Sequence, residues 1–467
     1  MERILIGKLG EHVGETVSIS GWVNVRRDQG KLVFFDFRDA TGMVQGVVLP
    51  GEEATMAVAK EVRNEYVVQV TGVVNKRPER NVQADKVNGD IELEIKGIEI
   101  LNESEPVPFD VTEDTLGVDE SVRLKYRYLD LRSPRLQRNI RMRDKIISFF
   151  RDYMHKNDFV EVETPMMMKG TPEGSREYVV PSRLEQGKFY VLPQSPQQFK
   201  QLLMVAGFEK YFQIARCMRD EDTRGDRQPE FTQLDYEMSF VTQEDVLGYT
   251  EAMFIKMVET LYPEKRISKV PFPRLTYAES MEKYGSDKPD LRENKEDPDE
   301  LAFAWIVDFP MFEKLDDGSI QAAHHPFCSV KPEDREKFLQ GEDLFSIRAN
   351  AYDLVLNGYE LSSGSIRIHK AEEQAQVFNL LGISEEEQQS RFGHILEAFK
   401  FGTPPHGGFA PGIDRIVMIL ENQPNIREVI AFPKTGEGKD LMTGAPAAIN
   451  PKQLTELGIT LTPKKDV

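Results

Sequence analysis

The stretch FQIARCMRDEDTRGDRQPEFTQLDYEMSF, residues 212–240, contains the pattern that decides the fold of the larger part of the chain. Two alternating segments flank a loop crowded with arginine, aspartate and glutamate. The alternation predicts two strands, with Gln233, Asp235 and Glu237 on one face of the second strand. A polar strand face beside arginines suits an anionic ligand that also carries an ammonium group. That face weakens the simpler interpretation, a solvated hairpin tip.

A second stretch, GTPPHGGFAPGIDRIVMIL at residues 402–420, places a glycine-rich entry before a helical segment. Arg415 lies in the first turns of that helix. Glycines let a ligand approach the backbone closely, and a helix N-terminus attracts phosphate. The pattern indicates a phosphate site, although a lone arginine is usually a surface charge.

Asn357-Gly358 predicts a tight two-residue hairpin. Pairing around this turn places Val355 opposite Glu360, and Asp353 then lies diagonally adjacent to Glu360 on the same face. Two carboxylates on one face suit Mg²⁺ that is held jointly with phosphates. A pair of exposed hairpin acids is the alternative interpretation.

The N-terminal part of the chain alternates in short segments, and the predicted strands are 16–26, 32–39, 43–49, 66–74 and 91–100. A helix-compatible stretch lies between the third and fourth strands, which is the order of an OB-fold barrel. Such barrels bind single-stranded nucleic acid on aromatic side chains beside a basic groove. Phe35 and Phe37 share one face and Phe34 lies on the other, so at most one face is core. The pattern alone leaves RNA binding and a plain phenylalanine core as equal alternatives.

The predicted barrel domain covers residues 1–103, a hinge covers 104–137, and a catalytic domain covers 138–467. The hinge has prolines near its start, many acids and then a basic stretch. The next segment, Arg138–Asn157, predicts an amphipathic helix. Its predicted apolar side holds Ile140, Ile147, Phe150 and Met154. Strands and helices then mix without a repeating βαβ rhythm, which favours an α+β domain with an antiparallel sheet flanked by helices.

The composition narrows the class of protein. The formal net charge of -19 argues against nonspecific coating of nucleic acid, but it permits local basic patches. Cys217 and Cys328 are the only cysteines, which excludes a disulfide framework and a zinc site made mainly of cysteine. The sequence has neither a membrane-spanning apolar run nor an apolar signal core. We therefore expect a cytoplasmic protein without membrane contact.

The two stretches quoted first resemble motifs 2 and 3 of class II aminoacyl-tRNA synthetases, and Asn157–Met166 resembles motif 1, the dimer-interface motif. Three ordered motifs behind an OB domain resemble the subclass for aspartate, asparagine and lysine. Shorter phrases resemble the bacterial-type aspartyl-tRNA synthetases, and they are YRYLDLR (126–132), TPEGSREY (171–178), QSPQQFKQ (194–201), FTQLDYE (231–237), HHPF (324–327), GSIRIH (364–369) and FPKTGEGKDLMTGAP (432–446). The resemblance covers essentially the whole chain and implies a homodimer through motif 1.

The implied reaction activates L-aspartate with ATP, releases pyrophosphate and transfers the aspartyl group to the 3′-terminal adenosine of tRNA(Asp), with Mg²⁺ as cofactor. Neither step needs a protein nucleophile, so positioning and charge neutralisation carry the catalysis. An enzyme that also charges tRNA(Asn) is the alternative. Gln29 stands at a loop position that separates strict from relaxed enzymes, and glutamine there is compatible with both.

Positions that match the family motifs imply roles for individual residues. Arg219 and Arg415 would be the catalytic arginines, at the α-phosphate and the γ-phosphate of ATP. The other implied ATP ligands are Asp220, Glu221, Gln228, Phe231, Glu360, Gly412, Ile413 and Asp414. The implied aspartate ligands are Glu173, Gln197, Lys200, Arg219, Asp235, His324 and Arg367. Asp353 and Glu360 would hold the metal. The implied anticodon contacts are Arg27, Phe34, Gln45 and Glu92.

Two implied pocket cations, Lys200 and Arg367, argue against asparagine or lysine as the substrate. A neutral amide would leave buried positive charge unmatched, at a cost of about 2–5 kcal/mol. A non-catalytic RNA-binding relative should have lost Arg219, Glu360 or Arg415, and all are present. A tRNA-independent ligase would lack the barrel.

One departure from the bacterial pattern lies between motifs 2 and 3, where relatives usually carry an inserted domain. Here DKPDLR (287–292) leads through a short acidic stretch to WIVDFPMFE (305–313). We expect activity to survive, because the insertion is peripheral to the active site.

Overall fold

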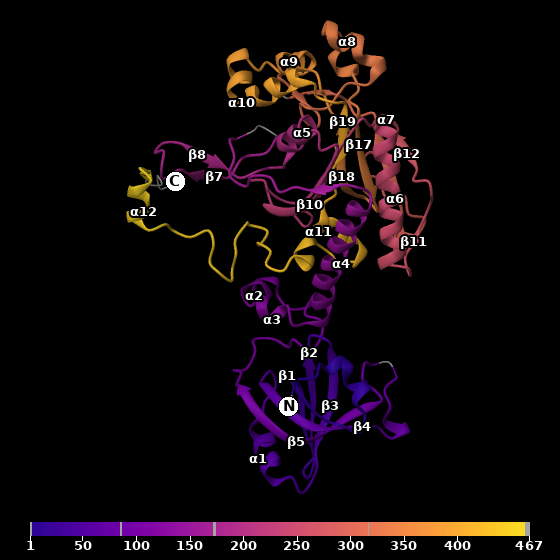
Figure 1. Cartoon of the computed structure of the whole chain (residues 1–467), viewed down its shortest axis with the longest axis vertical. Helices are drawn as coiled ribbons and strands as arrows, with labels where there is room; N and C mark the ends of the chain where they lie inside the picture. Colours follow the sequence, from indigo (N-terminus) through magenta and orange to yellow (C-terminus); the bar gives the residue numbers. More distant parts are fainter. Residues whose placement is uncertain (1, 85, 171–173, 316, 463–467) are drawn as a thin grey trace. The chain divides into compact units, whose positions relative to one another are not determined.

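A computed structural model describes residues 2–84, 86–170, 174–315 and 317–462. The chain forms two compact units, Met1–Val118 and Asp119–Val467 (Figure 1), each with a hydrophobic core of its own. The finer division predicted at residues 103 and 137 stays a prediction.

The first unit contains a closed barrel with the strand order β1-β2-β3-β5-β4. Its elements are β1 Thr16–Asp28, β2 Val33–Asp39, β3 Gly42–Val48, α1 Glu53–Glu61, β4 Val67–Lys76 and β5 Ile91–Asn102. The predicted order, with a helix between the third and fourth strands, is confirmed. Phe35 and Phe37 are buried in the barrel core, whereas Phe34 on the other face is only partly buried. The phenylalanines therefore divide between core and surface, as the strand period of two requires.

The second unit is built on an eight-stranded sheet in the order β12-β14-β17-β18-β19-β10-β9-β6. Its strands are β6 Val160–Glu161, β9 Lys210–Met218, β10 Glu230–Ser239, β12 Arg274–Thr276, β14 Phe303–Val307, β17 Ala351–Leu356, β18 Tyr359–Ile366 and β19 His406–Phe409. The central strands are antiparallel, as predicted, whereas the edge strands β12 and β6 run parallel to their neighbours. The α+β class is confirmed. Smaller sheets pair β7 Val179–Pro181 with β8 Phe189–Val191, β11 Arg266–Ile267 with β13 Glu300–Leu301, and β15 Phe312–Lys314 with β16 Ile320–Ala322.

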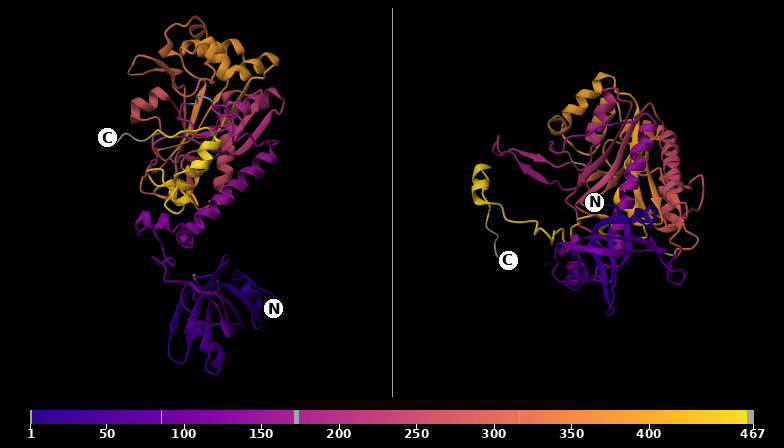
Figure 2. Two further views of the ribbon diagram at one scale, coloured as in Figure 1. Left: turned by 90° about the vertical axis from the view of Figure 1, so that its left-hand side faces the viewer. Right: turned by 60° about the horizontal axis from the view of Figure 1, so that its bottom comes forward.

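Helices α4, α6 and α11 lie along one face of this sheet (Figure 2). Their apolar side chains pack with those of the strands and form the main core. The helices are α2 Glu120–Lys125, α3 Arg127–Asp130, α4 Pro134–Lys156, α5 Gln197–Val205, α6 Gln243–Leu261, α7 Tyr277–Tyr284, α8 Arg335–Gln340, α9 Ala371–Leu380, α10 Glu385–Ala398, α11 Ile413–Leu420 and α12 Pro451–Glu456. Helix α4 begins before the predicted Arg138, since proline suits a first helical turn. Its fully buried isoleucine is Ile146, whereas the predicted Ile140 and Ile147 are partly buried. No described helix is long and apolar enough to cross a membrane.

Alternation along the central strands separates the core from a cavity. Leu234 and Tyr236 of β10 and Leu354 of β17 belong to the main core. Asp235 lies between Leu234 and Tyr236, and Asp353 comes directly before Leu354. Because successive side chains of a strand alternate, both aspartates lie on the opposite face of the sheet, where they line a cavity. Two of the three residues predicted for the polar face of β10, Gln233 and Asp235, therefore line this cavity.

Candidate functional site

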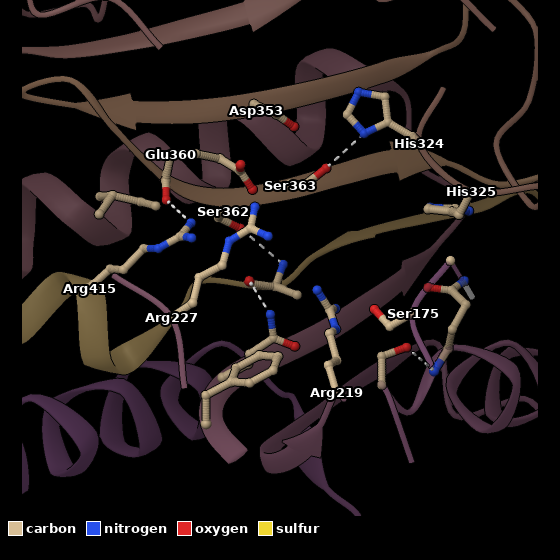
Figure 3. A pocket seen from close by; sticks show the side chains of 18 of the residues that line it. Ser175, Arg219, Arg227, His324, His325, Asp353, Glu360, Ser362, Ser363 and Arg415 are labelled. Atoms are coloured by element: carbon tan, nitrogen blue, oxygen red, sulfur yellow. Dashed lines mark hydrogen bonds between the residues drawn. The ribbon is translucent and has the colours of Figure 1, made fainter. Parts of the chain in front are cut away.

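A cavity of about 650 Å³ opens on the sheet face opposite α4, α6 and α11 (Figure 3). Its wall combines β10, β17 and β18 with the start of α5, the approach to α11 and the loops between them. Most residues predicted to bind substrates line it: Gln197, Lys200, Arg219, Glu221, Gln228, Phe231, Asp235, His324, Asp353, Glu360, Arg367, Gly412, Asp414 and Arg415. The predicted aspartate ligand Glu173 lies outside the described residues.

One end of the cavity, here called the amino-acid end, is built on a buried network of two cations and two carboxylates. Lys200 Nζ donates a hydrogen bond to Asp235 Oδ2 at 2.8 Å and lies 3.2 Å from Glu237 Oε2. Arg367 Nε donates to Glu237 Oε1 at 2.9 Å. All four residues are at most 2% exposed. Gly408 on β19 makes room for this network, because a Cβ atom there would lie 2.1 Å from Glu237 Oε2.

The two carboxylates differ in their electrostatics. Burial raises the pKa of Asp235, and Lys200 offsets this only in part. Burial also opposes ionisation of Glu237, but Arg367 and Lys200 outweigh it and lower its pKa to about 2. Asp235 Oδ1 is buried and accepts no hydrogen bond from the described residues, and the Tyr211 hydroxyl donates to Gln213. Since Asp235 lines the cavity, a cationic group of a ligand is a fitting partner for that oxygen.

Two consecutive histidines serve different parts of the cavity. His325 Nε2 lies 2.7 Å from Arg367 Nη1, and burial together with the charge of Arg367 holds its pKa well below the usual value. His325 is therefore neutral and accepts from the guanidinium. His324 Nδ1 lies 3.4 Å from Ser363 Oγ (Figure 3). The His324 ring is edge-on to the ring of Phe309. Burial lowers the pKa of His324 as well.

The other end, here called the nucleotide end, carries arginines that are less buried. The Arg219 guanidinium lies over the Phe231 ring, 5.0 Å from its centroid. Arg415 Nη1 donates to the Glu360 carbonyl at 2.7 Å (Figure 3). Its Nη2 lies 3.2 Å from Asp226 Oδ2. Arg227 forms a similar pair with Glu221, in which its own side chain is 45% exposed. These side chains present planar donors to the cavity, as phosphate recognition requires.

Some predicted nucleotide ligands bind the protein itself. The Gln228 amide pairs with Lys434, accepting from its backbone N–H at 2.8 Å and donating to its carbonyl at 3.1 Å. Asp414 accepts from the Thr232 backbone N–H at 3.1 Å and from Arg143. Ile413 is buried in the main core, and neither it nor Asp220 is among the residues that line the cavity. The side chains of Gln228 and Asp414 thus support the wall that holds the arginines.

Comparison with known families agrees with this geometry. The model of the class II tRNA synthetases for D, K and N matches residues 119–436. The chain belongs to this family. A model described as an OB-fold nucleic acid binding domain matches residues 17–101 of this class II synthetase.

Curated relatives of the synthetase extend over nearly its whole length. The aspartate–tRNA(Asp/Asn) ligase of Rubrobacter xylanophilus is 42% identical over 96% of this chain and 95% of its own. The aspartate–tRNA ligase of Staphylococcus epidermidis is 40% identical, with 97% of each chain covered. The first alignment runs over 574 positions, more than the 467 residues here, so that relative has residues without a counterpart in this chain. In this chain, residues 285–299 connect α7 to β13. This connection lies where we predicted that the usual inserted domain is missing.

Solved structures show the same fold at lower sequence identity. Asparaginyl-tRNA synthetase from Pyrococcus horikoshii, complexed with asparaginyl-adenylate, has a TM-score of 0.74 at 21% identity and covers 97% of this chain and 100% of its own. Aspartyl-tRNA synthetase from Entamoeba histolytica has a TM-score of 0.73 at 22% identity, with 93% and 91% covered. Both likenesses establish the fold of the synthetase.

The predicted metal ligands of the synthetase, Asp353 and Glu360, both line the cavity (Figure 3). Val355 pairs with Glu360 as predicted, but a bulge at Leu361 places Asp353 opposite Ser363. Burial and the charge of Glu360 raise the pKa of Asp353 well above its usual value, and its Oδ1 accepts no hydrogen bond from the described residues. Two crowded carboxylates with an unpartnered oxygen fit a divalent cation that takes its other ligands from phosphate. Within the described residues no third His, Cys, Asp or Glu completes a protein-only site.

Several cavity residues of the synthetase were not assigned from the sequence. Asp226 and Arg227 were visible only as part of a charged loop. Asp287, from DKPDLR, and Phe309, from WIVDFP, flank the stretch where we predicted that an insertion is missing. No spacing in the sequence marks these last two, because their place depends on how β12 and β14 meet the sheet.

On the barrel unit, the predicted anticodon residues lie on one outward face. Arg27 pairs with Phe34 across β1 and β2, and Gln45 of β3 is opposite Asp36. Glu92 lies on the same face of β5, the parallel neighbour of β3. Arg27 forms two hydrogen bonds with Asp36, of 2.7 and 2.9 Å. A partly exposed aromatic ring with polar neighbours is the arrangement that stacks and reads unpaired bases.

Proposed function

We propose that this chain is an aspartate–tRNA ligase whose amino-acid end selects aspartate through Lys200 and Arg367. The observation that carries the proposal is the buried pair of cations at one end of a cavity whose other end presents arginines for phosphate. Asparagine has no second carboxylate for this pair, and lysine would add a third cation. Relatives named as aspartate–tRNA ligases support the same choice.

Aspartate has three charged groups, and the amino-acid end offers a partner for each. Its side-chain carboxylate would meet Lys200 and Arg367, while its ammonium would meet the unpartnered Oδ1 of Asp235. Its α-carboxylate would face Arg219. Gln197 and His324 line the cavity and would close around the substrate, together with Glu173 from the loop outside the described residues.

The reaction needs no protein nucleophile. An α-carboxylate oxygen of aspartate attacks the α-phosphorus of ATP, and pyrophosphate leaves with the electron pair of the broken P–O bond. A hydroxyl of the terminal tRNA adenosine then attacks the activated carbonyl, and AMP leaves. Arg219 would stabilise the negative charge that develops between the carboxylate and the α-phosphate.

ATP would bind across the nucleotide end. Phe231 offers a ring for adenine and Glu221 an acceptor beside it, while Gly412 and Arg415 face the terminal phosphates. Gln228, Asp220, Ile413 and Asp414 would hold this wall in place. Bound Mg²⁺ would neutralise phosphate charge, and Asp353 and Glu360 would be its protein ligands.

The outward barrel face would read the anticodon, with Phe34 stacking on a base and Arg27, Gln45 and Glu92 contacting base edges. Relatives named aspartate–tRNA ligase and aspartate–tRNA(Asp/Asn) ligase both align with the chain, so a relaxed ligase is the second candidate. A homodimer through motif 1 is part of the proposal. Val160 and Met166 of that motif are 43% and 38% exposed, which leaves apolar surface for a second copy.

The test is transfer of labelled aspartate to purified tRNA(Asp) and, separately, to tRNA(Asn). We expect tRNA(Asp) to be charged. Charging of both would establish the relaxed ligase, in keeping with Gln29. Charging of neither by a chain that binds ATP would overturn the proposal in favour of a non-catalytic protein.

A further inference from the structure

Glu237 lies directly behind the two cations that we propose for aspartate recognition. Its Oε1 accepts from Arg367 Nε at 2.9 Å, and its Oε2 lies 3.3 Å from Arg367 Nη2 and 3.2 Å from Lys200 Nζ. Glu237 is fully buried and is not among the residues that line the cavity. A substrate in the cavity would therefore contact the two cations and not Glu237.

The hydrogen-bond donors of the two cations are nearly all taken. Among the described residues, Arg367 Nη1 is held by Ser365 Oγ at 2.6 Å and His325 Nε2 at 2.7 Å, while Glu237 takes Nε and one direction of Nη2. Lys200 gives one N–H to Asp235 and another toward Glu237. Since an arginine has five donors and a lysine three, each cation has one N–H left. Glu237 is the residue that contacts both cations and so fixes the direction of the remaining N–H of each.

We propose that Glu237 is a positioning residue that sets selectivity for aspartate by aiming one N–H of Lys200 and one of Arg367 at the same point in the cavity. A carboxylate accepts both donors with its two oxygens. The amide of asparagine has one acceptor oxygen and an NH₂ that would face a cation. Two fixed, convergent donors therefore favour aspartate, whereas two mobile cations would adapt to either side chain.

This inference rests on the proposed function, and the test begins with the parent chain. Aspartate-dependent pyrophosphate exchange gives KM for aspartate and for ATP, and asparagine is added as a competitor to obtain its inhibition constant. In Glu237→Gln one acceptor oxygen becomes an amide that donates toward the cations. We expect KM for aspartate to rise about 30-fold or more, as for a broken buried charge pair. KM for ATP should change less than about twofold, and the preference for aspartate over asparagine should narrow.

A matched control is Glu428→Gln. Glu428 is also a buried carboxylate that bridges two arginines, Arg123 and Arg135, at 3.0 and 2.9 Å, but it does not line the cavity. We expect this variant to lose thermal stability while keeping the parent KM values. A second variant, Glu237→Asp, keeps the charge but is too short to reach both cations. It should give a smaller rise in KM for aspartate, again with KM for ATP unchanged.

The outcomes separate the two proposals. A parent chain without aspartate-dependent exchange overturns the proposed function. An active parent with an unchanged KM for aspartate in either Glu237 variant overturns the inference, as does an equal loss for aspartate and ATP. If Glu237→Gln does not fold, as judged by circular dichroism, Glu237→Asp decides by the same criterion. A selective rise in KM for aspartate, absent from Glu428→Gln, supports it.

Discussion

The two ends of the cavity hold cations in different ways. At the amino-acid end, Lys200 and Arg367 are at most 2% exposed and form ion pairs with the buried carboxylates of Asp235 and Glu237. At the nucleotide end, the side chain of Arg415 is 20% exposed and that of Arg227 is 45% exposed, and each pairs with an acid that also lines the cavity. At the amino-acid end the charges are fixed and buried, whereas at the nucleotide end a ligand can replace the partners of the arginines.

This difference indicates which end of the cavity should select the amino acid and which end should bind and release phosphates during turnover. Buried charges cannot be rearranged without leaving one of them unmatched, so the amino-acid end discriminates between substrates by what fits its fixed charges. Arginines in partly exposed ion pairs give up their partners at small cost, because such pairs contribute only about 0–1 kcal/mol. The nucleotide end can therefore bind phosphates and release pyrophosphate in each cycle.

Lys200→Ala should have the largest effect, because it disrupts the buried charge network at the amino-acid end. It removes a ligand for the aspartate side chain and leaves Asp235 with a buried charge that has lost its cation. We expect aspartate-dependent pyrophosphate exchange to fall about 1000-fold, from the 3–5 kcal/mol cost of breaking a buried pair together with the lost substrate contact. Calorimetry should still detect ATP binding. Lys265→Ala is the control, because Lys265 is buried but bonds to Pro298 and Asp299 outside the cavity wall. Normal exchange in Lys200→Ala would refute the pocket assignment.

Buried His406, which lies close to the charges of the amino-acid end, also makes stability depend on pH. Burial lowers its pKa to about 4, opposed by Glu237 and assisted by Arg367 and His369. In the unfolded chain a histidine titrates near pH 6.5. As the pH falls from about 6.5 to 4, only the unfolded state takes up the proton, so stability is full above 6.5 and declines across this window. The loss from His406 is about 3 kcal/mol.

Urea unfolding between pH 7 and pH 4.5 measures this slope. In His406→Gln the amide can still donate to the Pro404 carbonyl, which His406 Nδ1 approaches at 2.8 Å. The variant should therefore fold and show a shallower decline. An identical slope in both proteins would mean that His406 is not the group that titrates, and His324 and His325, whose pKa values burial also lowers, would then account for the decline.

The contrast between the two ends was only partly predictable from the sequence. The period of two in β10 placed Asp235 on the cavity wall, and the Asn357-Gly358 turn fixed the pairing of Val355 with Glu360. Both signals are local, because strand alternation and turn geometry depend on neighbouring residues. The bulge at Leu361 escaped prediction, since an extra residue in a strand leaves no fixed mark in the sequence.

Most of the residue contacts that the sequence did not predict are between residues far apart in the chain. Glu237 was placed on a polar face, but its hydrogen bond with Arg367 joins residues that are 130 positions apart in the chain. Gln228 was expected to contact the nucleotide, whereas its amide pairs with the backbone of Lys434, 206 positions away. Local patterns assign a side chain to a face, and tertiary packing decides what that side chain meets there.

At the nucleotide end, Arg415→Lys tests whether ATP binding needs the planar guanidinium of Arg415. A lysine keeps the charge but cannot donate to the Glu360 carbonyl and to a phosphate in the same planar arrangement. We expect KM for ATP to rise about tenfold, the loss of one charge-assisted hydrogen bond, with KM for aspartate nearly unchanged. Arg348→Lys, at an ion pair with Asp334 that does not line the cavity, is the control. A larger effect on aspartate than on ATP would show that the two ends are coupled.

The smallest effect should come from Asp226→Asn, and its sign is the sharpest test of the contrast. Asp226 Oδ2 lies 3.2 Å from Arg415 Nη2, where a phosphate would compete with it. If that carboxylate is a replaceable partner, its removal frees Arg415 and lowers KM for ATP about two- to fivefold, the range of a partly exposed ion pair. Added salt should shrink the difference, because it screens the pair in the parent chain. A rise in KM for ATP would instead mean that Asp226 orients Arg415, so that the nucleotide end is as fixed as the amino-acid end.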